Sequence, residues 1–83
     1  MIDSKTKQRI VVQTHDQYGP YVTVSTYQDA GALEDALDDE YCVLYSIQVP
    51  AELRNEGGRQ LFFGNAADAA KVQAILDEIE FSW

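Results

Sequence analysis

The chain offers few side chains of the kinds that carry out chemistry. His15 is its only histidine and stands beside Asp16 in a turn-forming stretch. A general base needs a pocket and a reacting partner within hydrogen-bond reach, whereas a turn histidine is expected to face solvent. Cys42 is the only cysteine. The nearby acid Glu40 opposes thiolate formation, so we expect Cys42 to be a small structural residue.

Two groups of residues resemble ligand-binding motifs without matching them. The acids around Asp38 could hold Ca²⁺ or Mg²⁺, but an EF-hand alternates its ligands around a glycine in a loop, and these acids fall on an expected helix. Gly57-Gly58-Arg59 resembles a phosphate-binding loop, yet it precedes a strand and no Gly-Lys-Ser/Thr follows. No Gly-x-Ser-x-Gly elbow is present. The sequence therefore predicts a protein that is not an enzyme and that uses no metal or cofactor.

The most unusual segment is an acidic stretch without a single Lys or Arg. Its members are Asp29, Glu34, Asp35, Asp38, Asp39 and Glu40. On a helix, like charges four residues apart, such as Asp35 and Asp39, destabilise by about 0.2–0.5 kcal/mol per pair. The carbonyl end of the helix, where Glu40 falls, prefers cations. A segment with this much self-repulsion either keeps the protein in solution or meets a positive surface.

Composition limits the classes of partner. The 83 residues form one expected domain, 1–83, with a formal charge of −8. This charge argues against direct nucleic-acid or anionic-membrane binding, since both need Lys and Arg to neutralise phosphates. A lone cysteine cannot form an intramolecular disulfide, the N-terminus has no signal-peptide apolar run, and no stretch approaches the roughly 20 apolar residues of a membrane span. We therefore expect a soluble, cytoplasmic protein.

The hydrophobic patterning predicts the order β-β-α-β-β-α. Strands are expected over residues 9–14, 21–26, 41–49 and 59–63, with a helical turn over 51–55. The first two strands are expected to form a hairpin around a turn over residues 15–20, which includes Gly19 and Pro20. Asp29 is expected to cap the first helix and Asn65 the second, with Asp68 completing a capping box. The predicted fold is α+β, a two-layer sandwich of a four-stranded, mainly antiparallel sheet with both helices on one face.

The alternation of the strands also predicts an inner and an outer face of the sheet. Val22, Val24, Leu61 and Phe63 are assigned inward, as is the face of residues 41–49 that begins at Tyr41. The large side chains assigned outward are Tyr21, Tyr27, Leu44 and Phe62. Exposed aromatic side chains suit a protein interface. The alternatives are that other parts of the chain cover this face or that it pairs two copies as a homodimer. Trp83, near the chain end, could dock on the core edge or serve as an exposed anchor.

Three hypotheses account for the acidic segment. It could be a solvated face of a domain with a structural or dimerisation role. It could replace a nucleic acid on a basic protein or nucleoprotein complex, because helical carboxylates about 5–6 Å apart can present a row of negative charge. It could also belong to an immunity protein or antitoxin that neutralises a toxin nuclease.

In size, acidity and lack of catalytic motifs, the chain resembles the small phage or mobile-element inhibitors called anti-CRISPR proteins, some of which mimic nucleic acid. The resemblance lies in composition, so no residue role is carried over from it. Our sequence-based prediction is a stoichiometric binding protein that inhibits by occlusion. Its expected partner-binding residues are the six acids named above together with Tyr21, Tyr27, Phe62 and Trp83.

Overall fold

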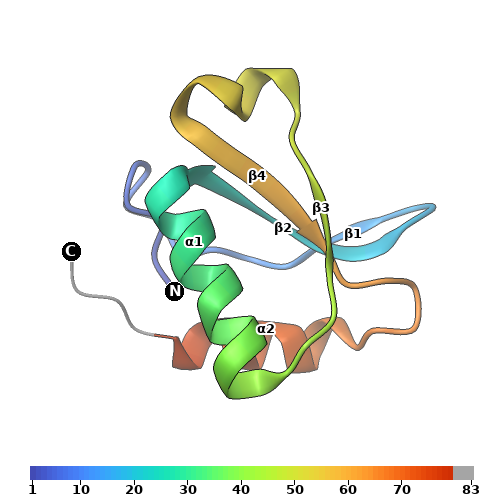
Figure 1. Cartoon of the computed structure of the whole chain (residues 1–83). Coiled ribbons are helices and arrows are strands. Elements are labelled where there is room, and N and C mark those ends of the chain that lie inside the picture. The colour runs from blue at the N-terminus through green and yellow to red at the C-terminus, as the bar shows by residue number, and fades with distance from the viewer. Residues whose placement is uncertain (80–83) are drawn as a thin grey trace.

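The computed structural model describes residues 1–79 and confirms the α+β architecture. Four antiparallel strands form one sheet in the order β1-β2-β4-β3. The strands are β1 (Gln13–His15), β2 (Gly19–Thr26), β3 (Ser46–Gln48) and β4 (Gly57–Phe62). The helices α1 (Tyr27–Ala36) and α2 (Ala69–Glu78) complete the fold, as Figure 1 shows. The central strands β2 and β4 are the two longest, so they set the register of the sheet.

One core joins the sheet to both helices. Val22 and Val24 are fully buried on the inner face of β2, and Val22 lies opposite the fully buried Leu61 of β4. Leu33 from α1 and Leu76 from α2 are fully buried in the same cluster. The predicted inward assignment of the two central strands is therefore confirmed, and both helices contribute to the core of that face.

The first strand is shorter than predicted and lies later in the chain. We expected it over residues 9–14, whereas β1 begins at Gln13. The reason is that the Gln73 side chain of α2 forms hydrogen bonds with the backbone of the residues before β1. The Val12 N–H donates to Gln73 Oε1 at 2.8 Å, and Gln73 Nε2 donates to the Ile10 carbonyl at 3.2 Å. Because these backbone groups bond to a helix side chain, they are not available to the sheet.

The first helix begins and ends differently from the prediction. Its N-cap is Thr26, whose hydroxyl accepts the Asp29 N–H, so the predicted Asp29 cap is wrong. The α-helix also stops at Ala36 and continues as a π-helical turn, η1 (Leu37–Tyr41). This turn ends at Cys42, which has a left-handed backbone with φ of 52°. The wider turn changes the angular spacing of the acids, so the simple four-residue rows expected for an α-helix end there.

The third strand differs most from the sequence-based prediction. Only Ser46–Gln48 of the expected residues 41–49 form β3, at the edge of the sheet. Tyr41, Val43 and Tyr45 still pack against the core, but from the π-helical turn and the following loop. The pattern thus predicted the packing of Tyr41, Val43 and Tyr45 correctly and their strand conformation wrongly, since packing against a core does not require pairing with a strand. The inward assignment is wrong for Ile47 and Val49, which are exposed because this edge segment lies away from the core.

The segment before β4 agrees with the prediction, whereas the start of α2 differs from it. The predicted helical turn is present as a 3₁₀-helix, η2 (Ala51–Glu56), and Gly57 follows it with φ of 76°. The predicted cap of the last helix is wrong, because Asp68 is the N-cap and accepts the Ala70 N–H at 2.9 Å. Asn65 instead donates its side-chain amide to the Gln17 carbonyl at 2.9 Å. None of the helices in the described part of the chain has both the length and the apolar character needed to cross a bilayer.

Candidate functional site

The acids at the end of α1 form one continuous exposed surface. We define the acidic surface as Asp35, Asp38, Asp39 and Glu40, all of which are exposed. Neither α1 nor the π-helical turn carries a basic residue in its last turn. Within residues 1–79, no Lys or Arg side chain forms an ion pair with any of the four. No cationic side chain in this part of the chain therefore offsets their repulsion.

Two of the six predicted acids are used inside the molecule instead. Asp29 is fully buried, and its Oδ2 accepts the Ser4 N–H at 2.8 Å and the Ser4 hydroxyl at 2.9 Å. The expectation that Asp29 contacts a partner is therefore wrong, because the carboxylate ties the N-terminal segment to α1. Glu34 pairs with Arg59 of β4 at 3.2 Å, with both side chains largely shielded. Glu34 thus lies beside the acidic surface with its charge already compensated.

Two tyrosines hold the π-helical turn in place. The Tyr45 hydroxyl donates to Asp38 at 3.1 Å, and the Tyr41 hydroxyl donates to Glu78 of α2 at 3.2 Å. Burial, together with the hydrogen bond to Asp38, raises the pKa of Tyr45 to about 12. Burial and the carboxylate of Glu78 raise the pKa of Tyr41 as well. A tyrosine hydroxyl is protonated at neutral pH even at its ordinary pKa of 10.0, so both hydroxyls donate there, and the raised pKa extends this into the alkaline range.

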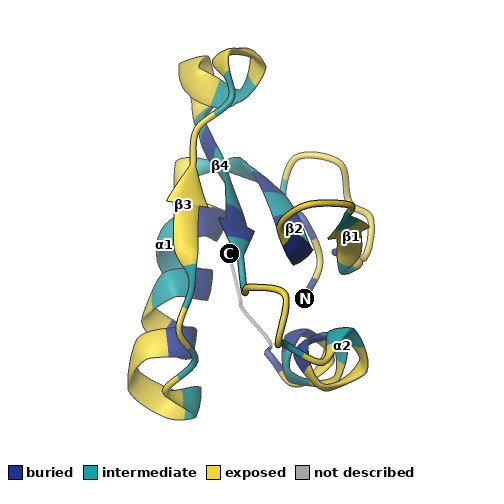
Figure 2. Cartoon of the chain, turned by 90° about the vertical axis from the view of Figure 1, so that its right-hand side faces the viewer, coloured by how far each residue is buried: buried dark blue, intermediate teal, exposed yellow. Residues whose placement is uncertain are grey.

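Apolar side chains lie close to the acidic surface along the chain. Leu44 is 90% exposed in the loop that follows the π-helical turn. Ile47 of β3 and Val49 beyond it are also exposed. Figure 2 shows β3 and the last turns of the helical segment as mostly exposed. Carboxylates and exposed apolar groups therefore occur together in residues 35–49.

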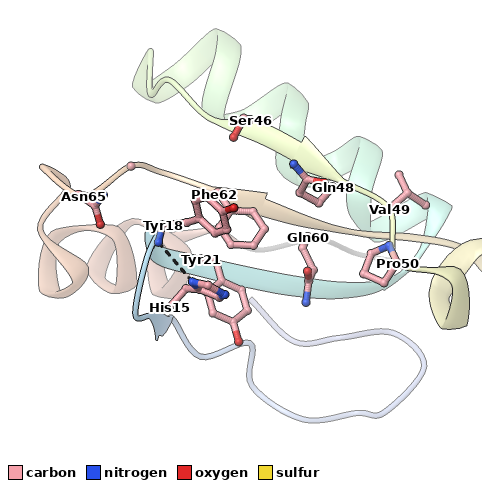
Figure 3. Close-up of a pocket in the computed structure, with 11 residues that line it drawn as sticks. His15, Tyr18, Tyr21, Ser46, Gln48, Val49, Pro50, Gln60, Phe62 and Asn65 are labelled. Atoms are coloured by element: carbon pink, nitrogen blue, oxygen red, sulfur yellow. Dashed lines mark hydrogen bonds between the residues drawn. The ribbon is translucent and has the colours of Figure 1, made fainter.

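The outer face of the sheet, away from the core and α1, carries a second feature, a groove of about 580 Å³. We call it the sheet groove. It is lined by His15, Tyr18, Tyr21, Ser46, Gln48, Val49, Pro50, Gln60, Phe62, Gly64 and Asn65. In Figure 3 the rings gather at one end of the groove, Gln60 and Gln48 lie along its middle, and Pro50 and Val49 stand at the other end, with α1 behind the strands. The predicted outward positions of Tyr21 and Phe62 are confirmed.

The ring end of the groove is an internally packed cluster. Tyr21 and Phe62, which are register partners on β2 and β4, stack with centroids 5.0 Å apart. Tyr18 packs at 4.8 Å from His15 and at 5.9 Å, edge to face, from Phe62. His15 Nδ1 accepts the N–H groups of Gln17 and Tyr18, at 3.0 and 3.3 Å. His15 is thus half-buried and holds the turn, where we had expected a solvent-facing residue.

The remaining predicted residues lie elsewhere. Tyr27 is 68% exposed, but as the first residue of α1 and not on the sheet face. Its ring lies under the Arg59 guanidinium, 5.9 Å from the centroid. Leu44 is in a loop, and Trp83 lies outside the described residues. Cys42 is an exposed free thiol at the end of the π-helical turn, where its backbone N–H donates to the Leu37 carbonyl.

Sequence reasoning missed part of the groove. Alternation along the strands found Tyr21 and Phe62, but Tyr18 and Asn65 belong to turns and show no periodic signal. Gln48, Val49 and Pro50 reach the groove only because β3 pairs with β4. A run of turn residues next to an aromatic strand would have been the available clue.

Within residues 1–79, the lining of the sheet groove includes no carboxylate, Lys, Arg or Cys. Among residues 1–79, no three His, Cys, Asp or Glu side chains are grouped so that they could hold a metal ion. No protein-family model, no curated protein and no solved structure matches the chain. The functional argument therefore depends on the acidic surface and the sheet groove themselves.

Proposed function

We propose that this protein is a stoichiometric inhibitor that binds a basic nucleic-acid-binding protein or complex and covers its polyanion site. The observation that carries the proposal is the acidic surface. Asp35, Asp38, Asp39 and Glu40 are exposed and adjoining, and no ion pair within residues 1–79 compensates them. They occupy the helix end that prefers cations. A partner rich in Lys and Arg would remove this repulsion on binding.

The physical route to inhibition is charge replacement. A protein site that binds nucleic acid releases counterions when phosphates neutralise its Lys and Arg side chains. A fixed group of carboxylates can occupy the same side chains, and the net charge of −8 steers the encounter over long range. The hydroxyl of Tyr45 holds Asp38 in place. Less ordering of the surface is therefore required at the moment of binding.

Affinity in this interface would also need apolar contact. Leu44, 90% exposed beside the π-helical turn, is the exposed large apolar side chain closest in sequence to the acidic surface. Surface charges alone contribute mainly to association rate and specificity, because rim charges are screened by salt. We therefore assign the carboxylates to recognition and Leu44 to apolar contact.

The test is a capture and competition experiment with two matched triple variants. One carries Asp35→Asn, Asp39→Asn and Glu40→Gln on the acidic surface. The control carries Asp16→Asn, Glu52→Gln and Glu56→Gln, which are exposed acids elsewhere, so both variants lose the same charge. Proteins captured from a lysate of the source organism are purified, and their binding to labelled nucleic acid is measured with each chain as competitor.

We expect the native chain and the control to displace the nucleic acid, and the acidic-surface variant to be at least tenfold weaker, about 1.4 kcal/mol. Competition by the native chain should also weaken steeply between 50 and 200 mM salt, on the order expected for contacts between ionised side chains. Equal competition by both variants, or affinity that does not change with salt, would contradict the proposal. A captured toxin nuclease as target would assign the same surface to an immunity protein.

A further inference from the structure

The sheet groove is a second surface that the proposed function does not use. It lies on the face of the sheet turned away from α1 (Figure 3). The acidic surface lies at the end of α1 and on the π-helical turn. Among the described residues 1–79, its lining includes no Asp, Glu, Lys or Arg, although the chain carries 14 acids. A phosphate-bearing ligand finds no cation in this lining, and a basic ligand finds no carboxylate. The groove is therefore matched to an uncharged occupant.

The polar groups of the groove lie between its two apolar ends. Phe62 and the rings stand at one end, and Val49 and Pro50 stand at the other. Gln48, between them, makes no side-chain hydrogen bond within residues 1–79, and the same holds for the hydroxyls of Tyr18 and Tyr21. These groups are free to donate hydrogen bonds to carbonyl oxygens of an occupant.

The length of the groove follows from the strand register. Ser46 lies opposite Phe62, and Pro50 comes four residues after Ser46 along the extended edge segment. At a rise of about 3.4 Å per residue, the two ends of the groove are roughly 13 Å apart. A polyproline II segment rises about 3.1 Å per residue, so four residues span this distance. Its backbone carbonyls have no internal partner and need donors.

The packing of the rings excludes a planar base between them. Neighbouring centroids lie 4.8 to 6.3 Å apart in the cluster of His15, Tyr18, Tyr21 and Phe62. This separation already corresponds to direct ring contact. A nucleobase therefore cannot insert between the rings, whereas the edge of a pyrrolidine ring can pack against the ridge that they form. Aromatic grooves with adjoining donors are a recurrent way of binding proline-rich segments.

We propose that the sheet groove binds an uncharged, proline-containing peptide segment in the polyproline II conformation. The rings of Tyr18 and Phe62 contact a proline at one end, and Val49 and Pro50 contact an apolar side chain at the other. Gln48 and the tyrosine hydroxyls donate to the carbonyls in between. This binding does not depend on the acidic surface, so it should be insensitive to salt.

The experiment is a titration of the ¹⁵N-labelled chain with blocked hexaproline, followed through the backbone amide resonances. Parallel titrations use a blocked Gly-Ser hexapeptide, maltotriose and adenosine. Tyr18→Ala removes a ring at the groove, and Tyr27→Ala is its matched control, since both tyrosines are exposed, by 57% and 68%. Gln48→Ala, at an exposed position on the edge strand, tests the donor without disturbing the ring cluster.

We expect hexaproline to shift the amides of residues 15–21, 46–48 and 60–62 and to leave those of residues 35–40 unchanged. Tyr18→Ala and Gln48→Ala should each weaken binding at least fivefold, and Tyr27→Ala should not. The proposal is overturned if hexaproline produces no shifts, or if maltotriose or adenosine moves the groove resonances and hexaproline does not. It is equally overturned if the same resonances move on dilution of the chain alone, because a second copy would then be the occupant.

Discussion

At the scale of single residues, Asp3 organises the N-terminal segment. Its Oδ1 accepts the N–H groups of Lys5 and Thr6 at 2.9 and 3.1 Å, and its Oδ2 accepts the Ser25 N–H from β2 at 3.1 Å. Burial by itself raises the pKa of Asp3, but the hydrogen bonds from Thr6, Ser25 and Lys5 outweigh it, so the pKa lies below its ordinary value of 3.8. The ionised form thus contributes to the stability of the fold.

Replacing the Asp3 carboxylate should destabilise the protein strongly. Asp3→Ala leaves the three backbone N–H groups without their acceptor, and we expect a loss of about 2–4 kcal/mol in the free energy of unfolding. Urea denaturation followed by circular dichroism measures it. Asp16→Ala, an exposed acid in the β1–β2 turn, is the control and should change stability by less than about 0.5 kcal/mol.

The same residue predicts a pH dependence. A carboxylate whose pKa is lower in the folded state stabilises the protein above its unfolded pKa, and this contribution is lost as the pH falls through the folded pKa. For Asp3 the loss begins near pH 3.8 and continues below it. The native chain should therefore lose more stability than Asp3→Ala over this range. Equal slopes for the two proteins below pH 3.8 would show that Asp3 does not carry this contribution.

At the scale of elements, two glycines in or beside α1 differ in whether the fold requires a glycine. Gly31 lies within α1, and a Cβ placed on it meets no atom within 4 Å. Gly57 begins β4 with φ of 76°, and a Cβ there would lie 2.5 Å from Cβ of Tyr27, the first residue of α1. The close approach of β4 to the start of α1 thus requires a glycine at residue 57, whereas the helix does not require one at residue 31.

The two alanine substitutions should therefore change stability in opposite directions. Gly31→Ala reduces the conformational freedom of the unfolded chain and should stabilise by about 0.5–1 kcal/mol. Gly57→Ala combines an unfavourable backbone with a steric clash and should destabilise by more than about 1 kcal/mol. Urea denaturation of both variants tests the pair. A stable Gly57→Ala variant would mean that α1 and β4 do not approach as closely as in this structure.

At the scale of the whole molecule, charge is unevenly compensated. The described ion pairs join Lys5 to Glu56, Arg9 to Asp77, and Arg59 to Glu34. Half of the six basic side chains are thus engaged away from the acidic surface. The repulsion within that surface consequently remains in the isolated protein, where only dissolved salt can screen it.

Added salt should therefore stabilise the free protein. Raising sodium chloride to about 0.5 M, where the screening length is only a few Å, should increase the free energy of unfolding by roughly 0.5–1 kcal/mol. The triple variant Asp35→Asn, Asp39→Asn, Glu40→Gln should gain clearly less, and the Asp16→Asn, Glu52→Gln, Glu56→Gln control should gain nearly as much as the native chain. Thermal unfolding at two salt concentrations measures this. A decrease in stability with salt would mean that attraction within the three ion pairs outweighs repulsion within the acidic surface.

Local patterns predicted those features that depend on residues close together in sequence. Alternation over residues 21–26 placed Val22 and Val24 in the core. The turn residues between the first two strands predicted the β1–β2 hairpin, but Gly19 and Pro20 belong to β2 itself, where they pair with His15 and Thr14. The same alternation put Tyr21 and Phe62 on the outer face, where they line the groove. The charge pattern located Asp35, Asp38, Asp39 and Glu40, which are exposed. The functions assigned to these residues remain proposals.

Tertiary structure decided what depends on distant residues. Asp29 is buried because Ser4 reaches it across 25 positions, and residues 10–12 leave the sheet because Gln73 binds their backbone. The groove exists because β4 inserts between β2 and β3, which brings Phe62 between Tyr21 and Ser46. The sequence by itself thus determined the types of element, their order and the faces of the central strands, since these follow from local periodicity. Which polar groups are satisfied and which surfaces adjoin depend on long-range contacts, so only the folded chain defines them.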